Sequence, residues 1–265
     1  LSIEGETDNL FENGDYIEFS GKRNDGKLDQ ALYNPSNQQP NPEISLFTDD
    51  AYYFLTIGTA NGKRYTNTSL AAGSLTSESF ISYTASLNLA QNYNPAALLI
   101  DQMSLSEYQA AEGYMGNMYA IGTTQSYTLA TPNAYSAASL TPTLSYYVAG
   151  RSNANSTDPA GNNHHLNVSI GNTVLGDAKF KGYAFTTAVA NLTYNLIGNT
   201  TSVNFSSIND LGAVTDYQSV AYARITYARG LDGTGIGFLP FKIATNNPEA
   251  LLNFNNANWN EAYIL

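Results

Sequence analysis

Apolar and polar residues alternate with a period of two in several short segments of the chain. The clearest segment is residues 166–170, with the sequence LNVSI, in which Leu, Val and Ile would face a core while Asn and Ser would face solvent. Gly171 and Asn172 follow and favour a two-residue turn into Val174 and Leu175, so this part of the chain predicts a β-hairpin. The same alternation predicts strands at residues 16–20, 144–148, 192–196, 203–205 and 220–227.

Helical periodicity is sparse. Residues 26–33 place Leu28, Ala31 and Leu32 at helical spacing behind Asp25, which predicts about two turns of helix. The composition points the same way, because the chain has 20 Tyr and 11 Phe but only 11 Lys and Arg together. We therefore predict an all-β fold in which an antiparallel β-sandwich is preceded by a smaller β segment.

Three segments have the composition of loops. Residues 34–42 contain three prolines among Asn and Gln, and residues 151–163 contain no apolar residue larger than Ala or Pro. Residues 60–79 are rich in Gly, Ser and Thr and mark the predicted boundary. Three parts are expected: an N-terminal β segment at 1–80, the sandwich at 81–235, and the start of a following β segment or a linker at 236–265.

The charge balance excludes some classes of partner. The chain has 22 acidic and 11 basic residues, a net charge of −11, so binding to nucleic acid or to anionic lipid is not expected. No apolar run approaches the roughly 20 residues of a membrane-spanning helix, so no membrane span is predicted. Without cysteine the chain has no disulfide, no thiolate zinc site and no cysteine nucleophile.

The composition also bears on the compartment. No basic segment followed by an apolar one stands at Leu1, so a leader peptide is expected to have been removed or omitted from the sequence. Few lysines, many Asn, Ser, Thr and Tyr residues and no cysteine are typical of an exported bacterial protein. We expect an extracytoplasmic location, either secreted or at the outer-membrane surface.

The two histidines are the first candidates for chemistry. His164 and His165 are adjacent at the start of a predicted strand, where successive side chains point to opposite faces, so they are not expected to hold one metal together. A serine hydrolase is rejected as well, because the nearest match to a nucleophile elbow, GRSNA at 150–154, lies in a polar loop. No catalytic residue and no metal site are predicted from these residues.

Acidic residues near the N-terminus are candidate calcium ligands. Asp25 and Asp29 flank a Gly-containing turn, and Asp49 and Asp50 are adjacent, although the full calcium-loop pattern with its distal Glu is missing. Calcium is the only cofactor that the sequence suggests.

Aromatic residues are candidate ligand or partner contacts. Tyr146, Tyr147 and Tyr183 could stack on sugar rings, although a tyrosine at strand spacing is more often part of the core. Phe254 and Trp259 lie after the last predicted strand, in a tail that is expected either to fold back as extra β structure or to expose apolar side chains.

Two sets of short blocks in the chain resemble one known family. The first blocks are GDYIEF at 14–19, NDGKLD at 24–29, ALY at 31–33, NP at 41–42, SLFTD at 45–49 and YFL at 53–55. The second are EGY at 112–114, AGRS at 149–152, HHLNV at 164–168, FKGY at 180–183 and ARITYAR at 223–229. The first set resembles the region upstream of the peptidase domain in gingipain-type cysteine peptidases, and most closely that of the type IX secretion system sortases of Bacteroidetes. The second set resembles the jelly-roll domain that follows in the same proteins, and also galactose-binding-like jelly rolls in general.

The resemblance implies a jelly-roll sandwich that accompanies a catalytic domain. Catalysis in that family requires a His and a Cys on a later α/β domain, and this chain has no Cys, so no catalytic residue is carried over. The resemblance implies that the chain is the non-catalytic part of a larger surface protein, and that this parent protein is a cysteine endopeptidase.

Three functions from different classes stay open. The chain could be the accessory β region of a secreted, cell-surface gingipain-type peptidase or sortase-like protein, whose catalytic domain lies beyond this chain. It could instead be a carbohydrate-binding jelly-roll module or a structural, adhesin-like surface module. The corresponding partners are a downstream peptidase domain of the same polypeptide, cell-surface glycans, or proteins of the secretion system.

Overall fold

The computed structural model of this chain describes residues 2–4, 11–56, 58, 73–96, 108–243 and 249–259. Within these residues the regular structure is almost entirely antiparallel β-sheet, and the helical segments are short 3-10 turns. No helix among them has the length and apolar character needed to cross a membrane.

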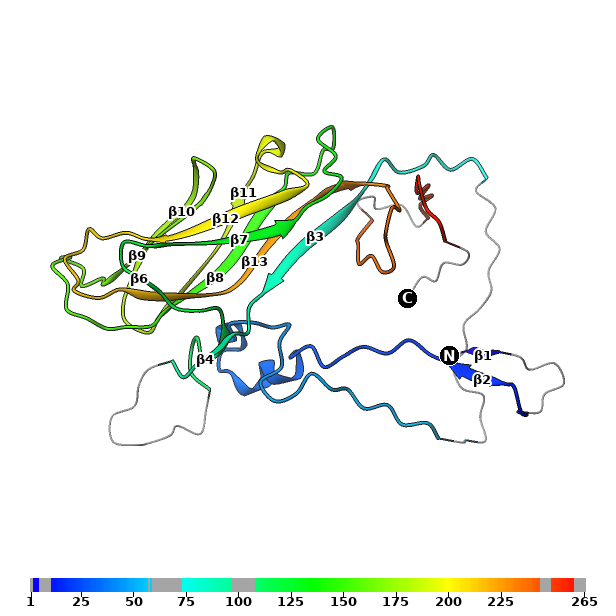
Figure 1. Cartoon of the computed structure of the whole chain (residues 1–265), viewed down its shortest axis with the longest axis horizontal. Helices are drawn as coiled ribbons and strands as arrows, with labels where there is room; N and C mark the ends of the chain where they lie inside the picture. The colour runs from blue at the N-terminus through cyan, green and yellow to red at the C-terminus, as the bar shows by residue number, and fades with distance from the viewer. Residues whose placement is uncertain are drawn as a thin grey trace.

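Two packed sheets form the body of the molecule (Figure 1). The first sheet has the order β10 (Thr173–Phe180), β9 (His164–Ile170), β12 (Thr200–Ser207) and β7 (Thr124–Ala130). The second has the order β11 (Phe185–Asn191), β8 (Thr143–Gly150), β13 (Tyr217–Gly230) and β3 (Phe80–Asn88), with β6 (Tyr119–Ala120) paired to β13.

The strand order is that of a jelly roll. From β7 onward the chain crosses between the sheets at each step except the β9–β10 hairpin. Late strands insert between early ones, so that β12 lies between β9 and β7, and β13 lies between β8 and β3. This interleaving of two four-stranded layers is the double Greek key of jelly rolls. The predicted all-β fold, an antiparallel jelly-roll sandwich, is confirmed.

The inner faces of the two sheets meet in one continuous core. Leu166, Val168 and Ile170 of β9 are buried there, whereas Asn167 and Ser169 are only half-buried on the other face. A one-residue slip in register would exchange these two sets, so the apolar alternation fixes the register of the strand. The hairpin prediction is confirmed too, because β9 pairs antiparallel with β10 across the Gly171 turn.

Four of the other strand predictions are confirmed and one is wrong. Residues 144–148, 203–205 and 220–227 lie in β8, β12 and β13, and residues 16–20 overlap β2 (Tyr16–Glu18), which pairs with β1 (Ser2–Glu4). Residues 192–196 instead contain the 3-10 helix η4 (Tyr194–Leu196). The amides of Leu196 and Ile197 bond back to the carbonyls three residues earlier, and this turn buries Leu192 and Ile197 as the chain crosses to β12.

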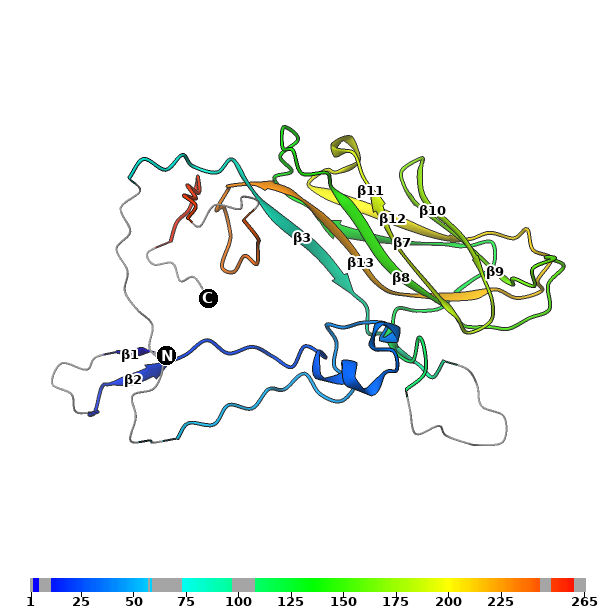
Figure 2. The same ribbon diagram turned by 180° about the vertical axis from the view of Figure 1, so that it is seen from behind.

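A small N-terminal lobe, residues 24–49, covers part of the outer face of the second sheet (Figures 1 and 2). It contains the 3-10 helices η1 (Leu28–Leu32) and η2 (Ser36–Gln38), so the helix expected at 26–33 is a 3-10 turn. The Asn41 side chain donates to the Ala221 carbonyl at 3.2 Å, and the Tyr147 hydroxyl donates to the Gln38 carbonyl at 3.2 Å. The short pair β4 (Asn92–Asn94) and β5 (Gly113–Met115) lies beside it.

The C-terminal tail lies beside the free edge of β3. Lys242 and Ser82 exchange both backbone hydrogen bonds, at 2.8 and 2.9 Å, and the Glu78 amide donates to the Leu251 carbonyl. These contacts are isolated bridges rather than strands. The described part of the tail meets the sandwich through these bridges and keeps Phe238 and Phe241 exposed, so both outcomes expected for residues 236–265 stay predictions. Most of the predicted linker, residues 59–72, lies outside the described residues.

Candidate functional site

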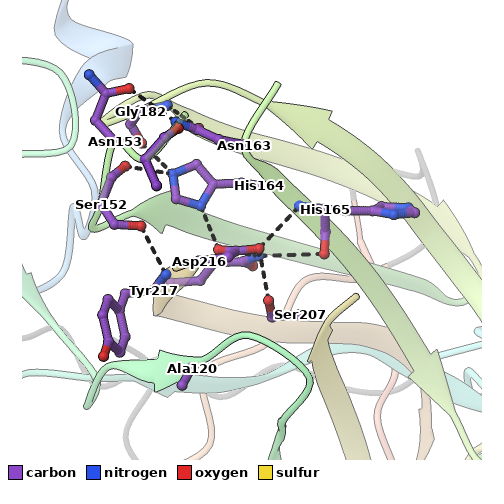
Figure 3. Close-up of polar contacts among 12 residues, drawn as sticks. Ala120, Ser152, Asn153, Asn163, His164, His165, Gly182, Ser207, Asp216 and Tyr217 are labelled. Atoms are coloured by element: carbon purple, nitrogen blue, oxygen red, sulfur yellow. Dashed lines mark hydrogen bonds and ion pairs between the residues drawn. The ribbon is translucent and has the colours of Figure 1, made fainter. Parts of the chain in front are cut away.

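His164 lies at one end of the core, fully buried, at the start of β9 (Figure 3). Its Nδ1 is 2.5 Å from Oδ1 of Asp216, and its Nε2 is 2.9 Å from the Ser152 carbonyl and 2.7 Å from the Gly182 carbonyl. Carbonyl and carboxylate oxygens accept hydrogen bonds, so both ring nitrogens face acceptors. The doubly protonated imidazolium is the form that can donate from both nitrogens.

Asp216 is also buried and accepts from several donors at once. Its Oδ2 receives the Ser207 hydroxyl at 2.8 Å, the Gln218 amide at 2.9 Å and the His165 backbone N–H at 3.3 Å. Gln218 in turn accepts the Tyr119 hydroxyl at 3.0 Å. The carboxylate is therefore saturated by hydrogen bonds, which is the condition for keeping a charge inside a protein.

The side chains of Ser207, Asp216 and His164 lie close together, but the hydrogen bonds between them do not support nucleophilic catalysis. A nucleophilic serine must face a free nitrogen of the base, whereas the Ser207 hydroxyl donates to Asp216. The second nitrogen of His164 is occupied by two carbonyls, and all three side chains are buried. The cluster therefore joins β9, β12 and β13 and the adjoining loops, and it offers no nitrogen to a substrate.

His165 points to the opposite face, as the strand geometry predicts. Its Nδ1 is 2.7 Å from Asp210 and its Nε2 is 2.8 Å from Asp177, both of which are largely exposed to solvent. Burial alone lowers the pKa of His165, but the hydrogen bonds to Asp210 and Asp177 outweigh it, and the pKa is raised from its ordinary value of 6.5. The bond to His165 lowers the pKa of Asp210.

The first two candidate calcium ligands have other partners. Asp25 pairs with Lys22 at 2.5 Å and with Lys27 at 3.1 Å. The hydrogen bond from Lys22 is the main reason that the pKa of Asp25 falls to about 2. Asp29 is buried and accepts the Leu46 backbone N–H at 2.7 Å, which closes the N-terminal lobe.

The other two candidates lie at the surface of the same lobe. Asp49 pairs with Arg23 at 3.3 Å, and Asp50 is exposed. Across the described residues, no group of three or more His, Asp or Glu side chains is arranged to hold a metal ion. The geometry therefore gives the calcium hypothesis no support, and calcium stays a prediction.

The three candidate sugar-stacking tyrosines lie in three different environments. Tyr146 points into the core, where its ring packs edge-on against Phe205 at 5.8 Å, so it is not available to a sugar. Tyr147 is on the opposite face of β8 and stacks on Phe185 at 4.7 Å, beneath the N-terminal lobe. Tyr183 is half-buried in the turn before β11.

The two aromatic candidates in the tail lie against each other. The rings of Phe254 and Trp259 are 5.3 Å apart, and the indole N–H of Trp259 donates to the Ile236 carbonyl at 2.9 Å. Trp259 keeps 38% of its surface exposed. Their role as partner contacts stays a prediction.

Sequence reasoning missed Asp216, Ser207 and Gln218, the polar residues around His164. Asp216 is 52 positions from His164 along the chain, and nothing in its sequence spacing marks it as a partner. The one available signal was an isolated acid four positions before the longest predicted strand, at 220–227.

No protein-family model and no curated protein matches the chain. Among solved structures, it is similar to dimeric latent PorU from Porphyromonas gingivalis, with 12% identity and a TM-score of 0.47, over 70% of this chain and 16% of that one. A carbohydrate-binding module CBM36 in complex with calcium and xylotriose matches with 18% identity and a TM-score of 0.29, over 53% of this chain and 98% of that one. The CBM36-1 domain of a multidomain xylanase from the hindgut metagenome of Trinervitermes trinervoides matches with 12% identity and a TM-score of 0.29, over 54% of this chain and 95% of that one.

The chain therefore spans about one sixth of the PorU chain that it matches. Because the TM-scores of these three structures are below 0.5, the jelly-roll assignment rests on the strand order of this chain.

Proposed function

We propose that this chain is the non-catalytic accessory β region of a secreted, cell-surface gingipain-type cysteine peptidase or sortase-like protein of the type IX secretion system. The catalytic domain then lies beyond Leu265, and the chain packs against it. The resemblance of the short blocks in residues 14–55 suggests the family, and an exposed aromatic strip supplies the physical argument.

The aromatic strip consists of Phe47 and residues 52–55, all of them exposed. Phe54 keeps 89% of its surface exposed and Tyr52 keeps 78%. Monomeric soluble proteins rarely expose contiguous apolar surface of this kind unless a partner covers it. Aromatic side chains are also enriched where protein surfaces meet.

The position of the strip fits contact with a neighbouring domain. Residues 50–56 extend from the N-terminal lobe away from the sandwich, alongside the segment that carries Phe19 (Figures 1 and 2). Tyr53 joins the two segments: its ring is 5.5 Å from Phe19 and its hydroxyl donates to the Lys22 carbonyl at 2.6 Å. An arm of this kind presents aromatic rings where another domain of the same polypeptide can reach them.

The coding sequence beyond residue 265 tests the proposal first. We expect an α/β domain with a His and a Cys, and a stop codon or an unrelated domain would overturn the proposal. The isolated chain is expected to hydrolyse neither casein nor a nitrophenyl ester, because it lacks a thiol and the ring nitrogens of both histidines are occupied.

A binding experiment then tests the aromatic strip. The Tyr52→Ser, Phe54→Ser double variant should keep the melting temperature of the wild-type chain but lose association with the separately produced catalytic domain. Val214→Ser is the matched control, since Val214 is 84% exposed on the sandwich itself. Equal association of the double variant and the wild-type chain would show that the aromatic strip is not the docking surface.

A further inference from the structure

A cavity of about 520 Å³ lies between the N-terminal lobe and the outer face of the second sheet. On the lobe side it is lined by residues such as Asn37 and Gln39, and on the sheet side by residues such as Tyr147, Phe185 and Val189. Its size falls within the range of about 300 to 1,000 Å³ that is usual for small-ligand sites. It lies outside the histidine cluster and the aromatic strip.

The lining is polar but carries no charge. Side-chain amides come from the lobe, and hydroxyls come from Ser36, Ser145 and Thr187. Among the residues that the structure describes, no Asp, Glu, Lys, Arg or His lines the cavity. The lining of the cavity is thus neutral although the chain has a net charge of −11. A charged ligand would lose hydration without gaining a counter-charge, so the lining favours a neutral ligand.

Gln39 supplies an acceptor that the protein itself does not use. The side chain is buried, and its Nε2 donates to the Gly26 carbonyl at 3.0 Å. A carbonyl oxygen can only accept, so this bond fixes the orientation of the amide and leaves Oε1 as an acceptor. Among the described residues Oε1 has no hydrogen-bond partner. A buried acceptor without a partner is costly, and a ligand hydroxyl would satisfy it.

Aromatic rings form part of the sheet side. Tyr147 and Phe185 stack with their planes 9° apart, and Tyr222 lies 6.2 Å from Tyr147. Arg224 does not line the cavity: it stacks over Tyr222 at 4.2 Å, and its Nη2 lies 3.5 Å from Glu43, while its buried Nε has no hydrogen-bond partner among the described residues. Tyr147 itself is almost completely buried, so the half-buried rings of Phe185 and Tyr222 supply the aromatic surface beside the neutral donors and acceptors.

We propose that this cavity binds a neutral saccharide unit of a glycan. A sugar ring has apolar C–H faces for the aromatic groups and several hydroxyls that both donate and accept, which matches amides, hydroxyls and the Gln39 acceptor together. A lipid tail would leave those polar groups unpaired, and a phosphate or carboxylate would find no cation. The proposal goes beyond the accessory role and does not depend on it.

Two exposed valines provide a matched test. Val189 lines the cavity on the edge strand β11 and is 72% exposed, whereas Val174 is 57% exposed on β10, the edge strand of the other sheet. The full chain and its Val189→Arg and Val174→Arg variants would be applied to an array of neutral, sialylated and sulfated glycans. The strongest neutral hit would then be titrated by calorimetry.

We expect wild type and Val174→Arg to bind the same neutral glycan and Val189→Arg to lose it, with unchanged melting temperatures. Asn37→Ala, an exposed substitution in the lobe, should weaken binding about tenfold by removing one hydrogen-bonding group. The Asn37→Ala variant also tests the proposal if Val189→Arg does not fold. The proposal is overturned if no glycan binds, if only charged glycans bind, or if the cavity variants bind as the wild type does.

Discussion

His164 and Asp216 form a buried, hydrogen-bonded pair whose partners come from loops and from three strands. Removing one member of a buried pair leaves the groups that it bonded without a partner, which typically costs about 3 to 5 kcal/mol. We expect His164→Asn to lower the free energy of unfolding by about that amount, measured by urea denaturation. His165→Asn is the control, and its loss should stay below about 1 kcal/mol because its acidic partners are exposed. Equal losses for the two variants would contradict the structural role of His164.

His165 gives the stability of the chain a pH dependence. Its pKa is raised in the folded protein, so the protonated form is bound more tightly there than in the unfolded chain. The stabilisation is complete below the unfolded value of 6.5 and is lost as the pH rises through the higher, folded value. The melting temperature should therefore fall as the pH rises above 6.5, by the equivalent of about 1 kcal/mol or less because Asp177 and Asp210 are exposed. His165→Gln should remove this slope, and an unchanged slope would show that another group titrates.

The sequence predicted how the two histidines diverge because that depends only on strand geometry. It could not predict which acids they meet, because Asp216 and Asp210 are 52 and 45 positions away and arrive there through the fold. The candidate calcium ligands failed to converge for a related reason. Asp25 pairs with Lys22 and Lys27, which are close to it in sequence, whereas Asp29 and Asp49 find their partners, Leu46 and Arg23, in distant parts of the lobe.

Strand β8 ends at a glycine where two other segments come close to its backbone. A Cβ at Gly150 would lie 2.0 Å from the Gly182 carbonyl oxygen and 2.5 Å from Nε2 of His164. The carbonyl belongs to the backbone and is one of the acceptors that hold His164, so it has little freedom to move. We expect Gly150→Ala to destabilise the protein by about 1 to 3 kcal/mol in thermal unfolding. Gly237→Ala, where the new Cβ meets nothing within 4 Å, should have almost no effect. Similar stabilities for the two variants would contradict the close approach.

The alternating apolar pattern predicted strands correctly where the segment pairs with a neighbouring strand of the sheet. Residues 166–170 and 220–227 each lie in a strand with one face in the core. Residues 192–196 show the same apolar spacing, yet this segment forms a 3-10 turn at Tyr194–Leu196, and Leu192 is buried just before it. Apolar spacing indicates which residues are buried. Residues in or beside a short turn can be buried at the same spacing as residues in a strand. Without the partner strand, the sequence cannot separate the two.

The N-terminal lobe and the sandwich belong to one folded unit at the scale of the whole molecule. Gln38 and Asn41 of the lobe bond to Tyr147 and Ala221 on the outer face of the second sheet. The sequence divided the chain near residue 80 because composition changes there, but composition carries no information on which face a segment covers. The cavity between lobe and sheet arises from the same long-range contacts and was beyond sequence reasoning as well.

The two ends of the chain should therefore differ in their contribution to stability. After residue 235 the described tail has no buried residue, and its backbone bonds to β3 and to the end of β13 can be replaced by water. A chain that ends at Gly235 keeps both sheets and should melt within about 4 °C of the full chain. A chain that begins at Gly73 loses the lobe and uncovers Tyr147 and Ala221, so its melting temperature should fall by about 10 °C or more.

Both truncations can be followed by circular dichroism and calorimetry under one set of conditions. If the chain ending at Gly235 unfolds or aggregates, the tail supplies core structure, and Phe254 and Trp259 are not free to meet a partner. If the chain beginning at Gly73 melts with the full chain, the lobe is a detachable segment, and the cavity it closes has no stable wall. The expected asymmetry follows from burial: side chains of the lobe, including Tyr33 and Gln39, are buried, whereas the rings of the tail stay partly in water.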